Sequence, residues 1–329
     1  MLKGIIRWLA YQMGLPDAVR RRKEARREGD CVYILFGHRV TAPGDSRGVP
    51  SDSLDALLGY LRSQFDALTV ADAVERLQAG GGSSRPGVAL TFDDGYADNL
   101  HHLLPVLRAR RFPATVFVTS GTIGTRERLW FEETRRCIRE TNAPAVEAEF
   151  LEQALPLSTP QQRTIAAEAV VEGMKATLAR PAEAVAHLRE ALGVAERPCD
   201  DTERMLSREE LAALAADPLV TIGAHTVRHP MLARLPAEDA AREIEDSRAA
   251  LAEIIGYQPA FFAYPNGQPE DIPPAAVEHL RRSGWKCAVT TVPAVARRDD
   301  DPMLLPRLPL GSGPPERLAW SLARAAQRA

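Results

Sequence analysis

The chain has 329 residues, of which 45% are hydrophobic and 26% are charged, with a formal net charge of −3. This size and composition fit an enzyme with one large buried core or two smaller ones, and they exclude a fibre or a disordered tail. The near-neutral charge argues against nucleic acid as a partner, and the four widely spaced cysteines argue against a zinc knuckle or a disulfide framework.

Residues 1–29 are expected to form a basic helical extension ahead of the main domain, residues 30–329. Apolar residues precede a basic run that consists of Arg20, Arg21, Arg22, Lys23, Arg26 and Arg27. No signal-peptide cleavage site follows, and no stretch approaches the roughly 20 apolar residues that span a bilayer. We therefore expect a cytoplasmic protein whose extension is a solvated helix packed on the domain; the alternative is an extension that contacts the inner membrane surface.

Beyond residue 30, short apolar runs alternate with helical patterns, which predicts an α/β fold with a largely parallel sheet. The predicted strands are residues 31–36, 88–92, 114–119, 220–224, 261–264 and 287–291, with a proline-punctuated seventh near 304–310. The predicted helices are residues 54–65, 70–78, 100–110, 237–255 and 274–283. Residues 80–84, Gly-Gly-Gly-Ser-Ser, predict a flexible connector, and residues from about 131 to 204, without a convincing strand, predict a helical insertion.

Two polar clusters follow predicted strands: Thr-Phe-Asp-Asp-Gly at residues 91–95 and His-Thr-Val-Arg-His at residues 225–229. Together they offer three metal ligands and one spare carboxylate, which fits a catalytic zinc site with a position open for water. In parallel α/β folds the carboxyl ends of strands form the active face, so the two clusters are expected to converge. Because neighbouring residues of a strand point to opposite faces, one aspartate can bind metal while the other stays free.

Each cluster also has a plainer interpretation. Asp-Gly is common turn chemistry, and two histidines can cap a helix or lie in a core. Pro230 disfavours a helical conformation at His229 and so indicates a bend after the strand. The occurrence of both clusters at strand ends favours a functional site.

With these clusters the sequence resembles the polysaccharide deacetylase family over about residues 32–310. The resemblance implies an α/β fold of the distorted (β/α)7 TIM-like barrel type. It also implies a metal-dependent hydrolase that removes N-acetyl groups from an amino-sugar polysaccharide, oligosaccharide or glycolipid precursor in exopolysaccharide or cell-envelope biosynthesis. Asp93 is then the catalytic base, and Asp94, His225 and His229 bind a divalent metal. Zinc suits this ligand set best, although cobalt, nickel and manganese accept similar donors.

The stretch Phe-Ala-Tyr-Pro-Asn-Gly at residues 262–267 lies where the family's third motif belongs. The resemblance makes Tyr264, Pro265 and Asn266 candidate substrate-binding residues, with a backbone N–H of this stretch as an oxyanion donor. Trp130 and Phe131 are further candidates for an apolar face against a sugar, and packing is their alternative role.

Two family features are missing from their usual places. Many members carry an arginine at about the position of Ala263, where it steadies the base. Arg307, near the last predicted strand, is our candidate for this role and for the substrate-binding group, with Arg39 and Arg228 as alternatives.

Many members also carry a histidine after a final Leu-x-Leu strand, where this chain has Gly311. Amide cleavage must protonate a poor leaving group, and an imidazole is suited to that task. His38, at the end of the first predicted strand, resembles the histidine of the circularly permuted, exopolysaccharide-associated branch of the family. We therefore predict His38 as the general acid; its alternative is a histidine that caps the strand or bonds to the backbone.

The departures at Ala263 and Gly311 leave open a barrel that binds metal and carbohydrate without catalysis. The basic amino terminus leaves open a deacylase of a small or lipid-linked sugar. Carbohydrate binding without acetate release would indicate the inactive barrel. Activity on a lipid-linked but not on a free oligosaccharide would indicate the deacylase of a lipid-linked sugar.

Overall fold

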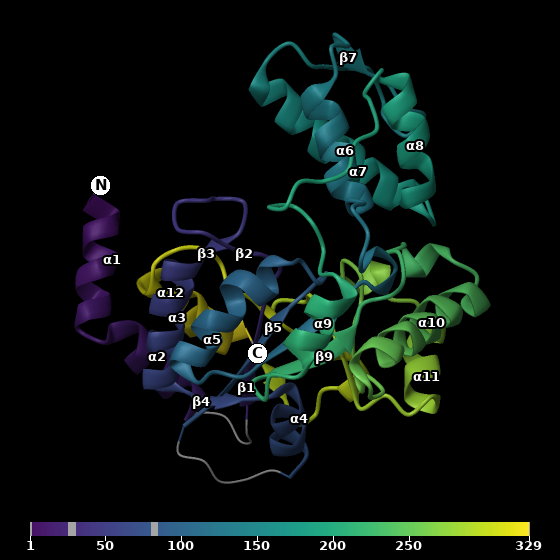
Figure 1. Cartoon of the computed structure of the whole chain (residues 1–329). Coiled ribbons are helices and arrows are strands. Elements are labelled where there is room, and N and C mark those ends of the chain that lie inside the picture. The colour runs from purple at the N-terminus through teal and green to yellow at the C-terminus, as the bar shows by residue number, and fades with distance from the viewer. Residues whose placement is uncertain (1, 26–30, 80–84, 329) are drawn as a thin grey trace.

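The computed structural model describes residues 2–25, 31–79 and 85–328 of the chain (Figure 1). Its main sheet runs in the order β11-β10-β9-β6-β5-β1-β12 and is parallel except at β12. The predicted parallel α/β architecture is therefore confirmed. The strands of this sheet are β1 (Cys31–Gly37), β4 (Asp66–Leu68), β5 (Gly87–Phe92), β6 (Ala114–Val118), β9 (Val220–Ala224), β10 (Phe261–Ala263), β11 (Cys287–Val289), β12 (Ala296–Arg297) and β13 (Leu308–Pro309).

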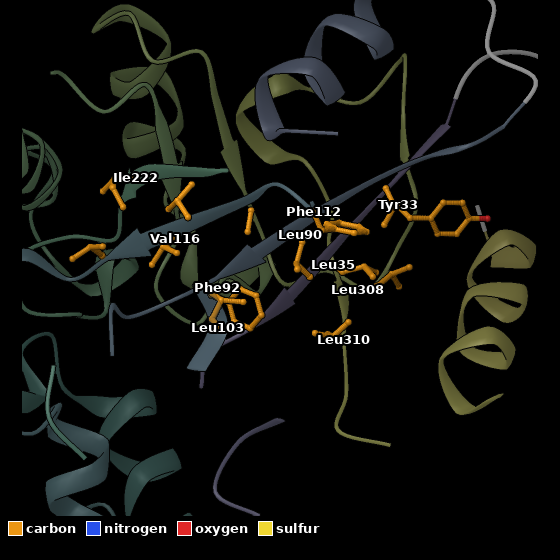
Figure 2. Packing of buried hydrophobic residues seen from close by; sticks show 14 of the residues in the cluster. Tyr33, Leu35, Leu90, Phe92, Leu103, Phe112, Val116, Ile222, Leu308 and Leu310 are labelled. Atoms are coloured by element: carbon orange, nitrogen blue, oxygen red, sulfur yellow. The ribbon is translucent and has the colours of Figure 1, made fainter. Parts of the chain in front are cut away.

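The segment that contains β13 joins the two ends of this sheet. Leu305 donates to the Ala288 carbonyl beside β11 over 3.0 Å, and Leu308 pairs with Leu35 of β1 in parallel register. The sheet must curl for one short segment to reach both ends, which agrees with the expected distorted barrel. Figure 2 shows Leu35, Leu90 and Leu308 in one apolar layer, and all three belong to the largest buried cluster.

The predicted helices are confirmed, with shifts of a few residues at their ends. One difference is a π-helical turn, Asn99–Leu103, that begins the helix predicted from residue 100. The helices of the barrel are α3 (Ser51–Gln64), α4 (Val70–Ala79), α5 (Leu104–Arg110), α9 (Arg208–Ala215), α10 (Ala237–Ile255), α11 (Pro274–Arg282) and α12 (Pro315–Arg328). The sequence patterns did not predict α9 or α12.

The insertion forms its own layer of helices beyond the sheet (Figure 1). Its helices are α6 (Trp130–Glu140), α7 (Pro160–Thr177) and α8 (Pro181–Ala191), and they share an apolar cluster that includes Val171 and Met174. The expectation that this region lacks strands was wrong, because β7 (Ala145–Val146) pairs antiparallel with β8 (Leu155–Pro156). Two-residue strands are too short to produce a recognisable alternating pattern.

The amino-terminal extension consists of two helices, α1 (Leu2–Gln12) and α2 (Leu15–Glu24). The second helix packs on the barrel: Tyr60 of α3 donates to Asp17 over 2.8 Å, and Lys23 donates to the Ala323 carbonyl of α12 over 3.0 Å. For α2 the structure therefore agrees with the expected packed helix. By contrast, Ile6, Trp8 and Leu9 of α1 are exposed, as is Met13 directly after it.

Arg26, Arg27 and the predicted connector at residues 80–84 lie outside the described residues. Within the part of the chain that is described, no helix has the length and apolar character needed to cross a bilayer.

The four cysteines are free thiols, three of them buried and Cys31 half-buried, as expected. The small strands β2 (Val40–Thr41) and β3 (Val49–Pro50) pair with each other in the loop after β1.

Candidate functional site

The carboxyl ends of β1, β5 and β9 meet at a cleft of about 350 Å³. Both sequence clusters reach it, although they lie on strands separated by more than a third of the chain. The predicted site residues that line the cleft are His38, Asp93, Asp94, His225, His229, Tyr264 and Asn266. Pro265 and Arg307 are not among its lining residues.

Asp94, His225 and His229 form a buried triad that can hold a metal ion. Asp94 Oδ1 lies 3.6 Å from His225 Nε2 and 3.9 Å from His229 Nε2. One ligand atom from each residue lies within 4.8 Å of the other two, a spacing that can surround a cation. Carboxylate and imidazole donors in this combination suit a divalent metal such as zinc.

The hydrogen bonds of the triad also fit a cation. His225 Nδ1 lies 2.7 Å from the Ala263 carbonyl, which assigns the ring proton to Nδ1 and leaves the lone pair of Nε2 facing Asp94. Asp94 Oδ1 is buried and has no hydrogen-bond partner among the described residues. A buried carboxylate oxygen without a donor is costly, and a metal ion would satisfy it.

Burial sets the protonation states of these side chains. It lowers the pKa of His225 to about 4, against the opposing charge of Asp93, and it also lowers the pKa of His229. Burial, followed by repulsion from Asp93 and Glu132, raises the pKa of Asp94. Neutral imidazoles are the form that ligates metals, so the histidines need no deprotonation near pH 7.

The backbone of the triad is held in left-handed conformations, which non-glycine residues rarely adopt. The φ angles are 79° at Asp94, 65° at Thr226 and 53° at His229. In the second cluster, Glu243 of α10 accepts the N–H groups of Val227 and Arg228 at 3.0 and 3.2 Å. Trp130 of the insertion donates to the His229 carbonyl over 2.9 Å. These contacts stabilise the turn that directs both histidines at Asp94.

Asp93 makes a different set of contacts from its neighbour Asp94. Its two oxygens each accept a hydrogen bond of 2.8 Å from Arg307, one from Nη1 and one from Nη2. Burial alone would raise the pKa of Asp93, but the charge and hydrogen bonds of Arg307 outweigh it and lower the pKa to about 2. The side chain is therefore an ionised carboxylate beside the triad, and it is not one of the three clustered ligands.

Arg307 is fully buried and is fixed on several sides. Its Nε donates to the Thr290 carbonyl over 2.7 Å, and its Nη1 also donates to Thr91 over 3.0 Å. Its guanidinium carbon lies 4.8 Å from the centre of the Phe36 ring. The expectation that Arg307 contacts substrate is not met by this position, because the side chain lies behind Asp93 and away from the cleft.

The two alternative arginines occupy other places. Arg39 pairs with Asp98 over 2.9 Å, and Arg228 lines a separate cavity beside α8. Neither is bonded to Asp93, so among the described residues Arg307 alone supplies its guanidinium partner.

His38 follows β1 and lines the same cleft as the triad residues. The protein atoms that surround its ring lower its pKa; Asp93 opposes this shift and Arg307 adds to it. The backbone carbonyl of His38 accepts from Asn99 over 3.1 Å, which orients the residue without using the imidazole. No hydrogen bond of the His38 ring is found within the described ranges, so the ring is free to meet a ligand in the cleft.

The third predicted stretch contributes less side-chain surface than expected. Tyr264 is fully buried, and its hydroxyl donates to the Met303 carbonyl over 3.0 Å, so most of this side chain serves packing. The Tyr264 N–H donates to Val289, and Pro265 has no N–H. No bond of the Asn266 N–H is found among the described residues, which leaves it as the donor of this stretch that a ligand can use.

The two aromatic candidates of the insertion differ. The Trp130 side chain is buried and bonded to His229, whereas Phe131 lines the cleft with its ring centre 5.3 Å from that of His229. Phe131 therefore offers the apolar face, and Trp130 supports the second cluster.

The sequence reasoning missed several residues of the cleft. Tyr96, Glu132, Arg135 and Lys175 all line it, and burial raises the pKa of Glu132. Tyr96 directly follows the first cluster, and this position could have indicated it. Glu132 and Arg135 come from α6, and no pattern in the sequence shows on which side of the barrel an insertion folds.

Comparison with known proteins places these features in context. The polysaccharide deacetylase family model matches residues 80–287. The Bacillus subtilis (strain 168) protein YxkH, named as a polysaccharide deacetylase, is 32% identical over 103 residues. That alignment covers 31% of this chain and 37% of YxkH, so the chain spans little more than a third of this relative's length.

Solved structures share the fold at low sequence identity. IcaB from Ammonifex degensii aligns with a TM-score of 0.59 and 21% identity, covering 91% of this chain and 98% of IcaB. The Streptococcus pyogenes deacetylase PplD, solved with acetate, gives a TM-score of 0.54 and 17% identity over 89% of this chain and 99% of PplD. A de-N-acetylase from Aggregatibacter actinomycetemcomitans gives 0.52 and 15% over 88% and 100%. These likenesses confirm the distorted barrel.

Two adjacent substitutions test which aspartate binds metal. We expect Asp94→Asn to weaken zinc binding by more than about a hundredfold, because partners outside the ligand shell already contribute ten- to a hundredfold. Asp93→Asn, the same chemical change one residue away, should retain zinc because Asp93 is bonded to Arg307. Zinc affinity would be measured by competition with a chromogenic chelator, and folding by circular dichroism. Equal loss of zinc in both folded variants would contradict the assignment of Asp94.

Proposed function

Because the chain belongs to the polysaccharide deacetylase family, we propose that it hydrolyses N-acetyl groups of an amino-sugar glycan in exopolysaccharide or cell-envelope biosynthesis. It is a hydrolase of that class with a candidate Asp94, His225 and His229 metal site. The observation that carries the proposal is an ionised Asp93 fixed beside this triad, with His38 in the lining of the same cleft.

Asp93 is proposed as the general base. A divalent ion in the triad, zinc by preference for these donors, would polarise the acetamide carbonyl and acidify a water molecule. The low pKa of Asp93 makes its carboxylate a weak base, which suffices only for a water that is already acidified. The hydrogen bonds from Arg307 leave further lone pairs on both carboxylate oxygens, so Asp93 can accept the proton and orient the attack.

His38 is proposed as the general acid. Water attack on the acetamide breaks the C–N bond, and the amine must receive a proton as it leaves. A lowered pKa makes the imidazolium of His38 a stronger proton donor, while it reduces the fraction of His38 that carries the proton near neutral pH. The Asn266 N–H, for which no bond is found among the described residues, would stabilise the oxyanion that precedes bond cleavage. Water and the amide thus yield acetate and a free amino sugar.

The nature of the substrate rests on the family and its relatives. IcaB, PplD and the Aggregatibacter de-N-acetylase share the fold, and the names of the last two describe deacetylation. The cleft is open to solvent at His38 and Arg47, which suits a carbohydrate chain that extends beyond the reacting sugar.

We also propose that α1 contacts an anionic membrane surface. Ile6, Leu9 and Met13 recur at helical spacing and are exposed, and Arg21 and Arg22 are exposed on the adjoining α2. Apolar side chains beside cations suit the headgroup region of acidic lipids.

The membrane contact is tested by co-sedimentation with lipid vesicles. The protein should bind phosphatidylglycerol vesicles and not phosphatidylcholine vesicles, and Leu9→Glu should abolish binding because a carboxylate would enter the apolar layer. Ile165→Glu is the control, since Ile165 is an exposed apolar residue of α7 in the insertion. Membrane binding that survives Leu9→Glu would exclude α1 as the contact.

Replacement of His38 tests the general acid against its structural alternative. His38→Ala should lower kcat for acetate release from chitotetraose by about a hundredfold or more, because the departing amine would lose its proposed proton donor. Hydrolysis of 4-nitrophenyl acetate should fall much less, since nitrophenolate leaves without a proton. A variant that loses both activities equally, or neither, would remove His38 from this role.

Arg307→Lys tests the fixed orientation of the base. Lysine keeps the positive charge but cannot donate two parallel hydrogen bonds to Asp93, so kcat should fall by about ten- to a hundredfold. KM and zinc affinity should stay within about twofold, because Arg307 touches neither substrate nor the triad. A proportionate loss of zinc binding would instead indicate a general collapse of the site.

A further inference from the structure

A second cavity, of about 280 Å³, adjoins the cleft that contains the triad. The two cavities share the lining residues Arg39, Arg47, Glu132 and Arg135. Arg128, Arg139 and Glu203 complete the lining of the second cavity, so five of its seven lining residues are arginines. We call this cavity the arginine trough. It begins where the candidate active site ends.

Two distant parts of the chain build the trough. Glu132, Arg135 and Arg139 are spaced by three and four residues, which places them on one face of α6, and Arg128 lies in the irregular segment just before this helix. The remaining arginines come from the loop after β1, which His38 begins. The helical insertion and the loop of the proposed acid therefore face each other across the trough.

Two of the arginines are tied to the protein and fix the walls. Arg128 is nearly buried and pairs with Glu203 over 2.9 Å. Arg39 pairs with Asp98 over 2.9 Å and lies against Tyr96, with 4.8 Å between the guanidinium carbon and the ring centre. The positive charges of Arg128 and Arg39 are therefore compensated by carboxylates of the protein itself.

The other three arginines leave charge available in the trough. Arg139 is exposed, and within the described part of the chain its guanidinium has no hydrogen bond or ion pair. Arg47 remains 45% exposed beside Asp45, and Arg135 remains 37% exposed while it pairs with Glu168 of α7. Asp98, Asp45, Glu203 and Glu168 pair with four of the five arginines, so among the described residues the unpaired positive charge of the lining is that of Arg139, while Arg47 and Arg135 remain partly exposed beside their partners.

We propose that the substrate carries a phosphate or carboxylate group, which binds in the arginine trough while the neighbouring acetamido sugar lies at the triad. This inference rests on the proposed deacetylase function. Guanidinium groups bind such oxyanions through paired N–H donors, and several cations around one cavity attract an anionic substrate. A glycosyl phosphate and a uronic acid unit share this chemistry, and a neutral glycan does not.

The test compares three substrates of similar length: chitotetraose, its 1-phosphate, and an oligosaccharide of alternating N-acetylglucosamine and glucuronic acid. At least one acidic substrate should show a kcat/KM for acetate release about tenfold above that of the neutral one, as expected for one added charge-assisted contact. Arg139→Gln should reduce this ratio severalfold. Arg298→Gln is the matched control, because Arg298 is exposed at the amino end of β1, beside β12.

The outcomes separate the two proposals. Equal kcat/KM values for acidic and neutral substrates, or an equal loss of preference in Arg298→Gln and Arg139→Gln, would overturn the anionic substrate. Preference for only one acidic substrate would identify the source of the charge as phosphate or carboxylate. If no substrate releases acetate, the proposed function fails. In that case calorimetry with chitotetraose 1-phosphate and metal-stripped protein still tests the trough, and binding that does not depend on Arg139 would overturn it.

Discussion

The buried pair between Arg307 and Asp93 is the interaction on which the rest of the site depends. Burying a guanidinium is costly unless its charge and its N–H groups are compensated. Here Asp93 takes two donors, and Thr290 and Thr91 accept the Nε and a further Nη1 contact. The pair can form only if the segment around β13 reaches both β1 and β11, so closure of the barrel and orientation of Asp93 are the same structural event.

The metal triad depends on a second constraint, the left-handed backbone at Asp94, Thr226 and His229. Such conformations cost on the order of 1–3 kcal/mol each and persist only where surrounding contacts determine them. In the turn that holds Thr226 and His229, these contacts are the hydrogen bonds to Glu243 of α10 and from Trp130 of the insertion. The turn after β5 also separates neighbouring aspartates, so that one faces Arg307 and the other faces two histidines.

Much of this arrangement could be predicted from the sequence because it is local. Strand patterns and the rule that active groups follow parallel strands brought residues 91–95, residues 225–229 and His38 to one face. The sequence made Arg307 a candidate partner of Asp93 but could not decide between it, Arg39 and Arg228, since 214 residues separate Arg307 from Asp93 and only the register of β13 on β1 aligns them. Tyr264 looked like a sugar contact by position, but its hydroxyl is bonded to Met303 inside the core. The placement of Glu132 and Arg135 at the cleft depends on how α6 packs against the barrel, and local sequence patterns do not predict how a helix packs.

The insertion connects the metal site to the proposed specificity site through a single rigid element. Trp130 and Phe131, at the start of α6, contact the loop of His229, and Arg139 lies near the other end of the same helix. Arg139 lies nine positions after Trp130, which corresponds to about 13 Å along the helix axis. Because α6 fixes both ends, the separation between the reacting acetamide and a bound acidic group is set by the helix rather than by a mobile loop. An acidic glycan is then selected by the spacing of its charge from the acetamido sugar as well as by the charge itself.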